Sequence, residues 1–347
     1  MKVFFNNIHY KTTLDIKEKM LMLALTPISF VYSKISDVRA FLYEKNIMKS
    51  YKSGILTISV GNLTTGGTGK TPITAEIANY LNQKGYKVAI LSRGYGGNLN
   101  KKNINIISDG HEIYYSASEA GDEPVWLAQN CPNVCVLTSS NRVQIAKYAE
   151  KELQCNAIIL DDGYQHLKIK RDINIVVVDN EKVFGNCKVL PIGPLRENIK
   201  NIKRSDKIIL VSKNPDVSLH NSMEKIKTIS SSEILQCIMQ PTTVYEINSN
   251  EKLNDNSDIL AFSAIGQPLQ FYNLLRDKFN LVGTYDFEDH HMYSKSDVEF
   301  LFDLANKSNA TLVTTEKDAV KLKCITDKPI YALRLEPQID MEKLIEI

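Results

Sequence analysis

The stretch ILTISVGNLTTGGTGKTP at residues 55–72 joins a β-branched apolar run to a glycine-rich loop and then to a helical segment. Glycines let consecutive backbone N–H groups turn toward phosphate oxygens, and the following helix offers its positive end to them. Thr64 stands where the first glycine of the GxxxxGK[ST] pattern belongs. The order of strand, loop and helix nevertheless predicts a phosphate loop.

Particular roles follow for the residues of this loop. Lys70 is expected to reach the β- and γ-phosphates of ATP, where its charge acts in catalysis, and Thr71 is expected to place its hydroxyl on Mg²⁺. ATP and Mg²⁺ are therefore the predicted cofactors. The predicted phosphate cradle consists of Gly66, Gly67, Thr68, Gly69, Lys70 and Thr71.

A carboxylate must also hold the metal, and the string AIILDDG at 157–163 supplies one at the end of an apolar run. Asp161 is the better candidate ligand because it directly follows the predicted strand, and Asp162 is the second. An acidic pair is also suited to capping the next helix. Together with a phosphate loop, the metal role is favoured.

From residue 55 onward, short β-branched runs alternate with helical stretches. Several runs are apolar throughout, as expected for strands of a parallel sheet that is covered on both faces. This alternation predicts an α/β fold with a P-loop NTPase-like open parallel sheet and ligands at the carboxyl ends of its strands. The predicted strands are 55–60, 87–91, 133–137, 157–160, 173–178 and 207–211.

A polar stretch at 248–258 interrupts the alternation, and a second, smaller α/β unit is predicted at about 256–330. The first domain is expected to cover 1–240 and to include an N-terminal membrane-associating helix. Residues 241–255 and 331–347 are expected to form linker strands and a C-terminal helix. Predicted strands of the second unit are 259–263, 281–285, 311–314 and 330–333.

The composition is that of an ordinary globular chain, with 347 residues, 43% hydrophobic and 24% charged, which indicates a full core and about two domains. A net charge of +2 gives no support to a nucleic-acid partner. Residues 1–52 hold nine Lys and Arg against four Asp and Glu, so a basic segment precedes a slightly acidic body. This indicates an anionic neighbour, such as a membrane surface.

Residues 20–33 form a charge-free run that is shorter than the roughly 20 apolar residues that span a bilayer, and it begins late for a signal peptide. Lys17, Lys19, Lys34 and Arg39 flank it. Such a segment suits either an amphipathic helix at the membrane interface or a helix packed on its own domain. The six cysteines show no paired zinc-like spacing, and buried free thiols in a reducing compartment are expected.

Other P-loop classes fit the loop less well. ATPases that dimerise on a deviant loop carry a lysine at the place of Thr65, and GTPases read guanine with an Asn/Thr-Lys-x-Asp motif. The nearest string here, at 315–318, has its lysine one place late. A small-molecule kinase remains, with a nucleotide-switched binding or assembly protein that hydrolyses ATP slowly as the alternative.

Seven strings follow one another along the chain: GNLTTGGTGKTP (61–72), LSRGYGG (91–97), GDEP (121–124), DDGYQH (161–166), LPIGPLRE (190–197), DFEDHH (286–291) and TTEKDAVKL (314–322). With these strings in this order, the chain resembles the tetraacyldisaccharide 4'-kinases of lipid A synthesis. The resemblance implies transfer of the ATP γ-phosphoryl to the 4'-hydroxyl of an acylated glucosamine disaccharide 1-phosphate. It also implies peripheral attachment to the cytoplasmic face of the inner membrane.

The resemblance also implies roles for residues outside the loop. Asp122 matches the family's catalytic base, although a carboxylate at this place also suits the cap of the next helix. His290, the first histidine of DFEDHH, is expected to orient and tune Asp122. Arg93 is expected to act in catalysis, and Arg196 and Glu123 in substrate binding. Gln165, His166 and Glu197 are expected near the site without an assigned role, and Arg171 is expected to be an ordinary surface residue.

Overall fold

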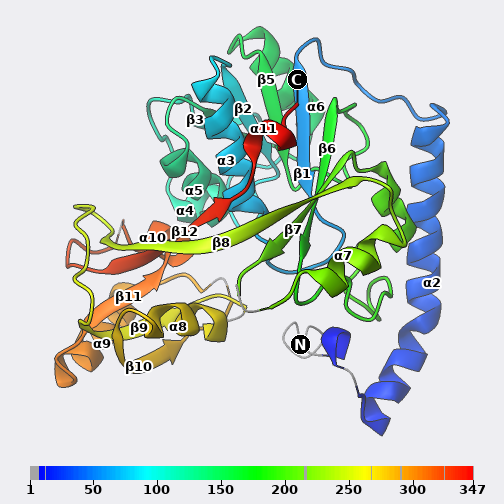
Figure 1. The fold of residues 1–347 in the computed structure, drawn as a ribbon. Coiled ribbons are helices and arrows are strands. Elements are labelled where there is room, and N and C mark those ends of the chain that lie inside the picture. The colour runs from blue at the N-terminus through cyan, green and yellow to red at the C-terminus, as the bar shows by residue number, and fades with distance from the viewer. Residues whose placement is uncertain are drawn as a thin grey trace. The chain divides into compact units, whose positions relative to one another are not determined.

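The computed structural model describes residues 8–11, 13–214, 217–266, 268–289, 291–323 and 325–346. The chain divides into two compact units (Figure 1). The first unit comprises Met1–Leu91, Arg142–Ile238 and Gln338–Ile347, and the second comprises Ser92–Asn141 and Met239–Pro337.

The first unit is built on a parallel sheet with the strand order β8-β7-β6-β1-β5-β2. Val60 at the end of β1 lies opposite Asp161 at the end of β5, so the phosphate loop and the acidic pair leave the sheet at the same level. The predicted open parallel sheet is confirmed. Its strands are β1 (Leu56–Gly61), β2 (Val88–Ser92), β5 (Ala157–Asp161), β6 (Ile173–Asp179), β7 (Lys207–Ser212) and β8 (Glu233–Glu246).

Helix α3 (Lys70–Gln83) follows the phosphate loop and packs against β1 and β5. Its buried positions Ile73, Ile77 and Leu81 are four residues apart, so they form one apolar stripe that faces the sheet. This packing fixes the N-terminal turn of α3 beside the strand ends. The unit also contains α6 (Arg142–Lys151), η1 (Ile199–Arg204), α7 (His220–Lys227) and α11 (Met341–Leu344).

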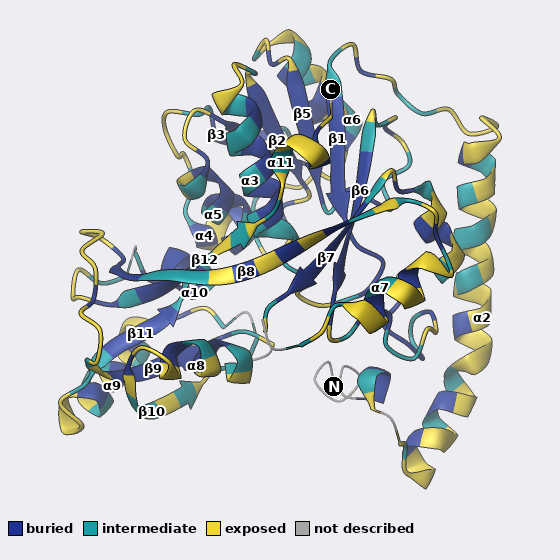
Figure 2. Cartoon of the chain, viewed as in Figure 1, coloured by how far each residue is buried: buried dark blue, intermediate teal, exposed yellow. Residues whose placement is uncertain are grey.

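Helix α2 (Ile16–Glu44) begins with a capping box between Asp15 and Glu18 and packs on the first unit with one face only (Figure 2). Its buried residues Glu18, Met22, Ser29 and Tyr43 are four, seven and fourteen residues apart, so they share that face. The Ser29 hydroxyl donates to the carbonyl of Val189 at 2.7 Å. The predicted N-terminal helix is therefore present and docked.

The opposite face of α2 is apolar and exposed. By length and composition α2 is long enough to cross a membrane, since the helix continues beyond the charge-free run on both sides. The charge-free run at 20–33 is too short to span a bilayer, but the whole helix is not. The large hydrophobic residues on the exposed face include Ile16, Met20, Leu23, Phe30, Val31, Ile35 and Val38.

The second unit contains a parallel sheet with the order β10-β9-β11-β12, and the second half of β8 lies next to β12. Alternate residues of β9 enter two hydrophobic clusters: Leu260 and Phe262 belong to one, Ile259 and Ala261 to the other. Its elements are β9 (Asp258–Ser263), α8 (Pro268–Arg276), β10 (Asn280–Asp286), α9 (Lys295–Lys307), β11 (Thr311–Thr315), α10 (Glu316–Leu322) and β12 (Tyr331–Gln338).

Residues 92–141 group with this second unit, which differs from the expected division at about residue 240. The segment holds α4 (Ala117–Ala120) and α5 (Asp122–Asn130), and α10 packs against both. It also holds an antiparallel pair, β3 (Asn105–Ser108) and β4 (Cys135–Thr138). The alternation of elements along the chain does not reveal which core each element joins.

The described cysteines are free thiols, as expected. Cys131, Cys135, Cys155 and Cys237 are buried, but Cys187 is exposed, which the sequence-based expectation of buried thiols did not anticipate.

Candidate active site

The phosphate loop is open and shaped by its glycines. Gly66 and Gly69 have φ angles of 109° and 85°, a region that glycine enters without the steric penalty of a Cβ. Gly69 is the N-cap of α3, so no side chain caps the helix and its first N–H groups are left to a ligand or water. The Asn62 amide donates to the Thr68 hydroxyl at 3.2 Å and ties the two ends of the loop together.

The segment LPIGPLRE runs alongside the loop. Thr64 forms an antiparallel bridge with Leu195, and the Thr65 N–H donates to the carbonyl of Pro194 at 2.8 Å. The Arg196 N–H donates to the carbonyl of Leu63 at 2.7 Å. Extended backbone at Thr64 needs no glycine, which explains physically why the loop departs from the usual pattern there.

Cationic side chains surround Asp162. Both carboxylate oxygens accept from Arg196 Nη1, at 2.8 and 2.7 Å, and Lys70 Nζ lies 3.7 Å from Oδ1. Arg142 Nη1 donates to the backbone carbonyl of Asp162 at 3.0 Å. Burial on its own would raise the pKa of Asp162, but Lys70 and Arg196 outweigh it and lower that pKa to about 2. The predicted residues Lys70, Asp162 and Arg196 therefore meet at one place.

Asp161 has a different environment from its neighbour. It is buried at the end of β5, and the Thr74 hydroxyl donates to its Oδ1 at 3.3 Å. Thr74 lies one turn beyond Thr71 on α3, so Asp161 sits beside the helix end that carries Thr71. No group of three or more His, Cys, Asp or Glu side chains suited to a metal occurs among the described residues. Mg²⁺ bound to a nucleotide does not require one, because phosphate and water oxygens fill most of its sphere.

Lys213 also belongs to this site and was not predicted. It follows β7, and its Nζ donates to the carbonyl of Gly67 at 2.7 Å and to Asp179 Oδ2 at 2.9 Å. Asp179 ends β6. The side chain therefore links the phosphate loop to two further strand ends. A lysine just after a predicted strand is the signal that sequence reasoning could have used.

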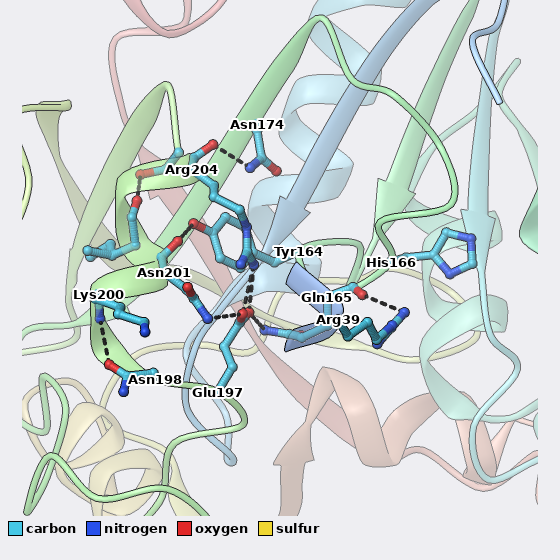
Figure 3. Close-up of polar contacts among 12 residues, drawn as sticks. Arg39, Tyr164, Gln165, His166, Asn174, Glu197, Asn198, Lys200, Asn201 and Arg204 are labelled. Atoms are coloured by element: carbon cyan, nitrogen blue, oxygen red, sulfur yellow. Dashed lines mark hydrogen bonds and ion pairs between the residues drawn. The ribbon is translucent and has the colours of Figure 1, made fainter. Parts of the chain in front are cut away.

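A polar network surrounds the buried carboxylate of Glu197 (Figure 3). Glu197 accepts from Arg204 Nη2 at 2.8 Å on each oxygen and from Asn201 Nδ2 at 2.9 Å. Gln165 Nε2 donates both to Glu197 Oε1 at 3.0 Å and to the carbonyl of Asn62 at 2.8 Å. The Glu197 carboxylate thus holds the amide that contacts the first residue after β1.

The turn DDGYQH is packed closely on β1. A Cβ at Gly61 would lie 2.7 Å from the Tyr164 nitrogen, so glycine is required there for the approach. Arg171 donates to the carbonyls of Gly163, Tyr164 and His166 at 2.9, 3.1 and 2.9 Å. The expectation that Arg171 is an ordinary surface residue is therefore wrong, because the carbonyls of this turn need a donor.

The same turn has a neutral histidine and a hydrogen bond from α2. Burial, with Arg142 and Arg171 nearby, lowers the pKa of His166 to about 3, so its ring is neutral at pH 7. Arg39 of α2 donates to the carbonyl of Gln165 at 3.3 Å (Figure 3). Helix α2 therefore contacts the turn whose glutamine side chain holds the phosphate loop.

In the second unit, Asp122 is the first residue of α5 and is buried. Its Oδ2 lies 3.6 Å from Lys317 Nζ and 4.0 Å from Lys321 Nζ. Glu123 is half-buried beside it, and Arg93 is exposed. Gly121, not Asp122, is the N-cap of this helix, and Asp122 Oδ1 accepts from the Glu123 N–H at 3.1 Å in its first turn.

Of the two adjacent histidines, the structure describes His291. His290 lies outside the described residues. The ring of His291 stacks on Phe287 with centroids 4.6 Å apart, and its Nε2 lies 3.2 Å from Asp297 Oδ2. Of the expected site residues, Lys70, Asp162 and Arg196 are brought together in the first unit, while Asp122, Glu123 and Arg93 belong to the second.

Residues 21–347 match the family model described as tetraacyldisaccharide-1-P 4'-kinase. The chain belongs to this family. A tetraacyldisaccharide 4'-kinase of Desulfotalea psychrophila is 36% identical over 330 residues, covering 92% of this chain and 94% of the relative. One of Syntrophus aciditrophicus is 35% identical over 349 residues, covering 93% and 92%.

A solved structure agrees with these relatives. The crystal structure of LpxK from Aquifex aeolicus in complex with ATP is 30% identical, with a TM-score of 0.77, and covers 93% of this chain and 96% of that one. Membership of the 4'-kinase family confirms the resemblance carried by the seven strings. In space, DDGYQH and LPIGPLRE adjoin the phosphate loop, whereas GDEP and TTEKDAVKL adjoin each other in the second unit.

The network around Glu197 predicts that two variants, each with one cationic residue replaced by methionine, differ in their free energy of unfolding. Arg204→Met leaves the buried Glu197 without its cation, and Asn201 and Gln165 retain hydrogen bonds to it, so the loss should lie near the lower end of about 3–5 kcal/mol. Lys200→Met removes an ion pair to Asp37 whose lysine is 59% exposed, and should cost less than about 1 kcal/mol. Urea unfolding measures both. Equal losses would contradict the role of the network.

Proposed function

We propose that this protein transfers the γ-phosphoryl group of ATP to the 4'-hydroxyl of a tetraacyldisaccharide 1-phosphate, in lipid A synthesis. The main support is a phosphate loop beside which Lys70 and Arg196 pair with the carboxylate of Asp162, in a chain of the 4'-kinase family. The solved relative was crystallised with ATP, which supports ATP as the donor.

The cations around Asp162 are suited to the donor's phosphates. Lys70, Arg196 and Arg142 converge on Asp162, and Lys70 is the first residue of α3, whose N-terminal end follows the loop. A bound triphosphate brings more negative charge than one carboxylate. Lys70 then exchanges part of its contact with Asp162 for phosphate oxygens of the donor.

The residues present also fit a Mg²⁺ ion. Thr71 offers a hydroxyl and Asp161 a buried carboxylate beside the same helix turn, while Asp162, already bound by Lys70 and Arg196, is the second acid. When bound, Mg²⁺ neutralises the phosphate oxygens of the donor. The role of this chain is to hold Thr71 and Asp161 level with the loop, through the register of β1 and β5.

Asp122 is the proposed base. Its carboxylate takes the proton of the 4'-hydroxyl as that oxygen bonds to the γ-phosphorus, and the bond from phosphorus to the β-phosphate oxygen breaks to release ADP. His290 is proposed to orient this base and Arg93 to neutralise the transferring group. Arg196 and Glu123 are proposed to bind the disaccharide.

We also propose that α2 attaches the protein to the cytoplasmic face of the inner membrane. Its exposed face combines large apolar side chains with Lys17, Lys19 and Lys34, the composition of a helix that lies in the interface of an anionic bilayer. The glycolipid acceptor resides in that bilayer, so attachment brings enzyme and substrate to one surface.

The proposed reaction predicts acceptor-dependent turnover of ATP. Phosphate transfer from labelled ATP to a panel of acylated and deacylated glucosamine disaccharides should occur only with an acylated 1-phosphate. Lys70→Ala should lower it by about 10²–10³-fold, as loss of one preorganised electrostatic contact does. Slow ATP hydrolysis that ignores every acceptor would instead identify a nucleotide-switched assembly protein.

The metal site predicts a difference between the two adjacent acids. Asp161→Asn should raise the Mg²⁺ concentration at half-maximal rate, because a neutral amide binds a hard cation poorly. Asp162→Asn should chiefly lower the rate and leave that concentration within a few-fold, because its carboxylate is held by Lys70 and Arg196. Magnesium titrations of both variants decide. The reverse pattern would make Asp162 the ligand.

Membrane attachment predicts loss of vesicle binding when the exposed face of α2 becomes polar. The triple variant Leu23→Ser, Phe30→Ser, Ile35→Ser changes side chains that are 75%, 61% and 64% exposed. Each contributes about 1.5–3 kcal/mol when fully buried, so co-sedimentation with anionic vesicles should weaken by at least about 10²-fold. Leu269→Ser, at a 71% exposed position of the second unit, is the matched control. Unchanged binding by the triple variant would contradict the attachment.

A further inference from the structure

The string TTEKDAVKL carries a buried charged cluster that the phosphate-transfer mechanism has not used. Within it, Asp318 is fully buried and accepts from the N–H of Ala264 at 2.9 Å and from the Thr315 hydroxyl at 2.8 Å. Thr315 is also the N-cap of α10, since its hydroxyl accepts from the Asp318 N–H. The Asp318 carboxylate is thus held rigidly between β9 and α10.

Lys321 lies between this carboxylate and Asp122. Its side chain is 1% exposed, and its Nζ lies 3.0 Å from Asp318 Oδ1 and 4.0 Å from Asp122 Oδ2. The same ammonium group lies 5.8 Å from the centre of the Tyr293 ring. A lysine buried to this degree requires paired anions, and here two carboxylates from different strings share it.

Two glycines allow the backbone segments next to Asp122 to approach each other closely. A Cβ at Gly121 would lie 2.4 Å from the carbonyl of Tyr95, and a Cβ at Gly97 would lie 2.5 Å from the carbonyl of Glu119. The loop at 94–97 therefore packs against the backbone that leads into Asp122. Helix α10 packs against α5 and brings its two lysines to the carboxylate of Asp122.

We propose that Lys321 and Asp318 are positioning residues for the phosphate transfer: Lys321 fixes the carboxylate of Asp122 and sets the pH range over which it is ionised, and Asp318 holds Lys321. The inference rests on the proposed role of Asp122 as the base. It gives a function to TTEKDAVKL that neither the phosphate loop nor the metal site requires.

The other charged groups near Asp122 are few among the described residues. On α10, Lys317 is 28% exposed and 3.6 Å from Asp122 Oδ2, while Glu316 bonds to Tyr245 and lies 3.5 Å from Arg334. On α4, Glu119 accepts from the N–H and hydroxyl of Ser116. Glu123 follows Asp122 on α5. Lys321 is thus the buried cation on this carboxylate and Lys317 the partly exposed one.

Opposite shifts are expected from neutralising the two positioning residues. Lys321→Met removes a cation from ionised Asp122, so protonation becomes easier and the acidic limb of the pH–rate profile should move up by about one pH unit or more. Asp318→Asn leaves the charge of Lys321 to Asp122 alone, so that limb should move to lower pH. The plateau kcat of Lys321→Met should also fall at least about 10-fold, because the base is no longer fixed.

Lys317→Met is the matched control on the same helix. Its ammonium is nearer to Asp122 than that of Lys321, but it is partly exposed, so water compensates for its loss. Its limb should move in the same direction as in Lys321→Met and by less than half as far. The double variant Lys321→Met, Asp318→Asn leaves no unpaired buried charge, and it should keep an upward shift even where the single lysine variant folds poorly.

A titration independent of turnover completes the test. In the full-length chain with ¹³C-labelled aspartate carboxyls, the Asp122 resonance is the one absent from Asp122→Asn, and its pKa should rise in Lys321→Met and fall in Asp318→Asn. Unmoved resonance and limb, with only a lower Tm, would overturn the proposal and leave a folding role. A moved resonance with an unmoved limb would refute Asp122 as the base, and with it the catalytic role of both residues.

Discussion

The parallel register of β1 and β5 is the constraint on which the candidate site depends. Val60 lies opposite Asp161, and the Gly163 N–H donates to the Val60 carbonyl at 3.0 Å, so the two strands end together and their loops leave on the same side. Because α3 packs on these two strands, its uncapped N-terminal turn is fixed beside both loops. A shift of one residue between the strands would separate the acids from Lys70 and Thr71 and turn their side chains to the opposite face.

Buried carboxylates organise both units in the same way. In the first unit Glu197 pairs with Arg204 and accepts a hydrogen bond from Gln165. The Gln165 side chain also donates to the backbone at the start of the phosphate loop. In the second unit Asp318 accepts hydrogen bonds from a backbone N–H and a hydroxyl. It pairs with Lys321, which also lies near Asp122. Such ion pairs add little net stability, because desolvation offsets much of their attraction. We propose that their contribution is to fix the direction in which one side chain of the site points.

Local patterns in the sequence predicted most of the architecture. Apolar β-branched runs identified ten of the strands, and the glycine-rich string identified the loop, because both signals lie within a few neighbouring residues. The first half of β8 was missed because it is no continuous apolar run, although its buried residues Leu235, Cys237 and Met239 alternate with exposed ones as in a half-buried strand. Contacts between positions far apart in the sequence could not be predicted from local patterns either. Lys213 meets Gly67 across 146 residues, and residues 92–141 join the second core through the packing of α10 on α5.

The docking of α2 bears on how the proposed membrane attachment would occur. Buried positions recur from Glu18 to Tyr43, and contacts to the first unit occur at Ser29, Asp37 and Arg39. A helix that crossed the bilayer would have to release this whole face and bury Glu18 and Asp37 in hydrocarbon. The exposed apolar face instead needs no rearrangement to enter the interface, with basic side chains at the level of the headgroups. Arg39 contacts the turn that carries Gln165, so the docking of α2 also supports the phosphate loop, and this favours the proposed attachment with the helix lying along the surface.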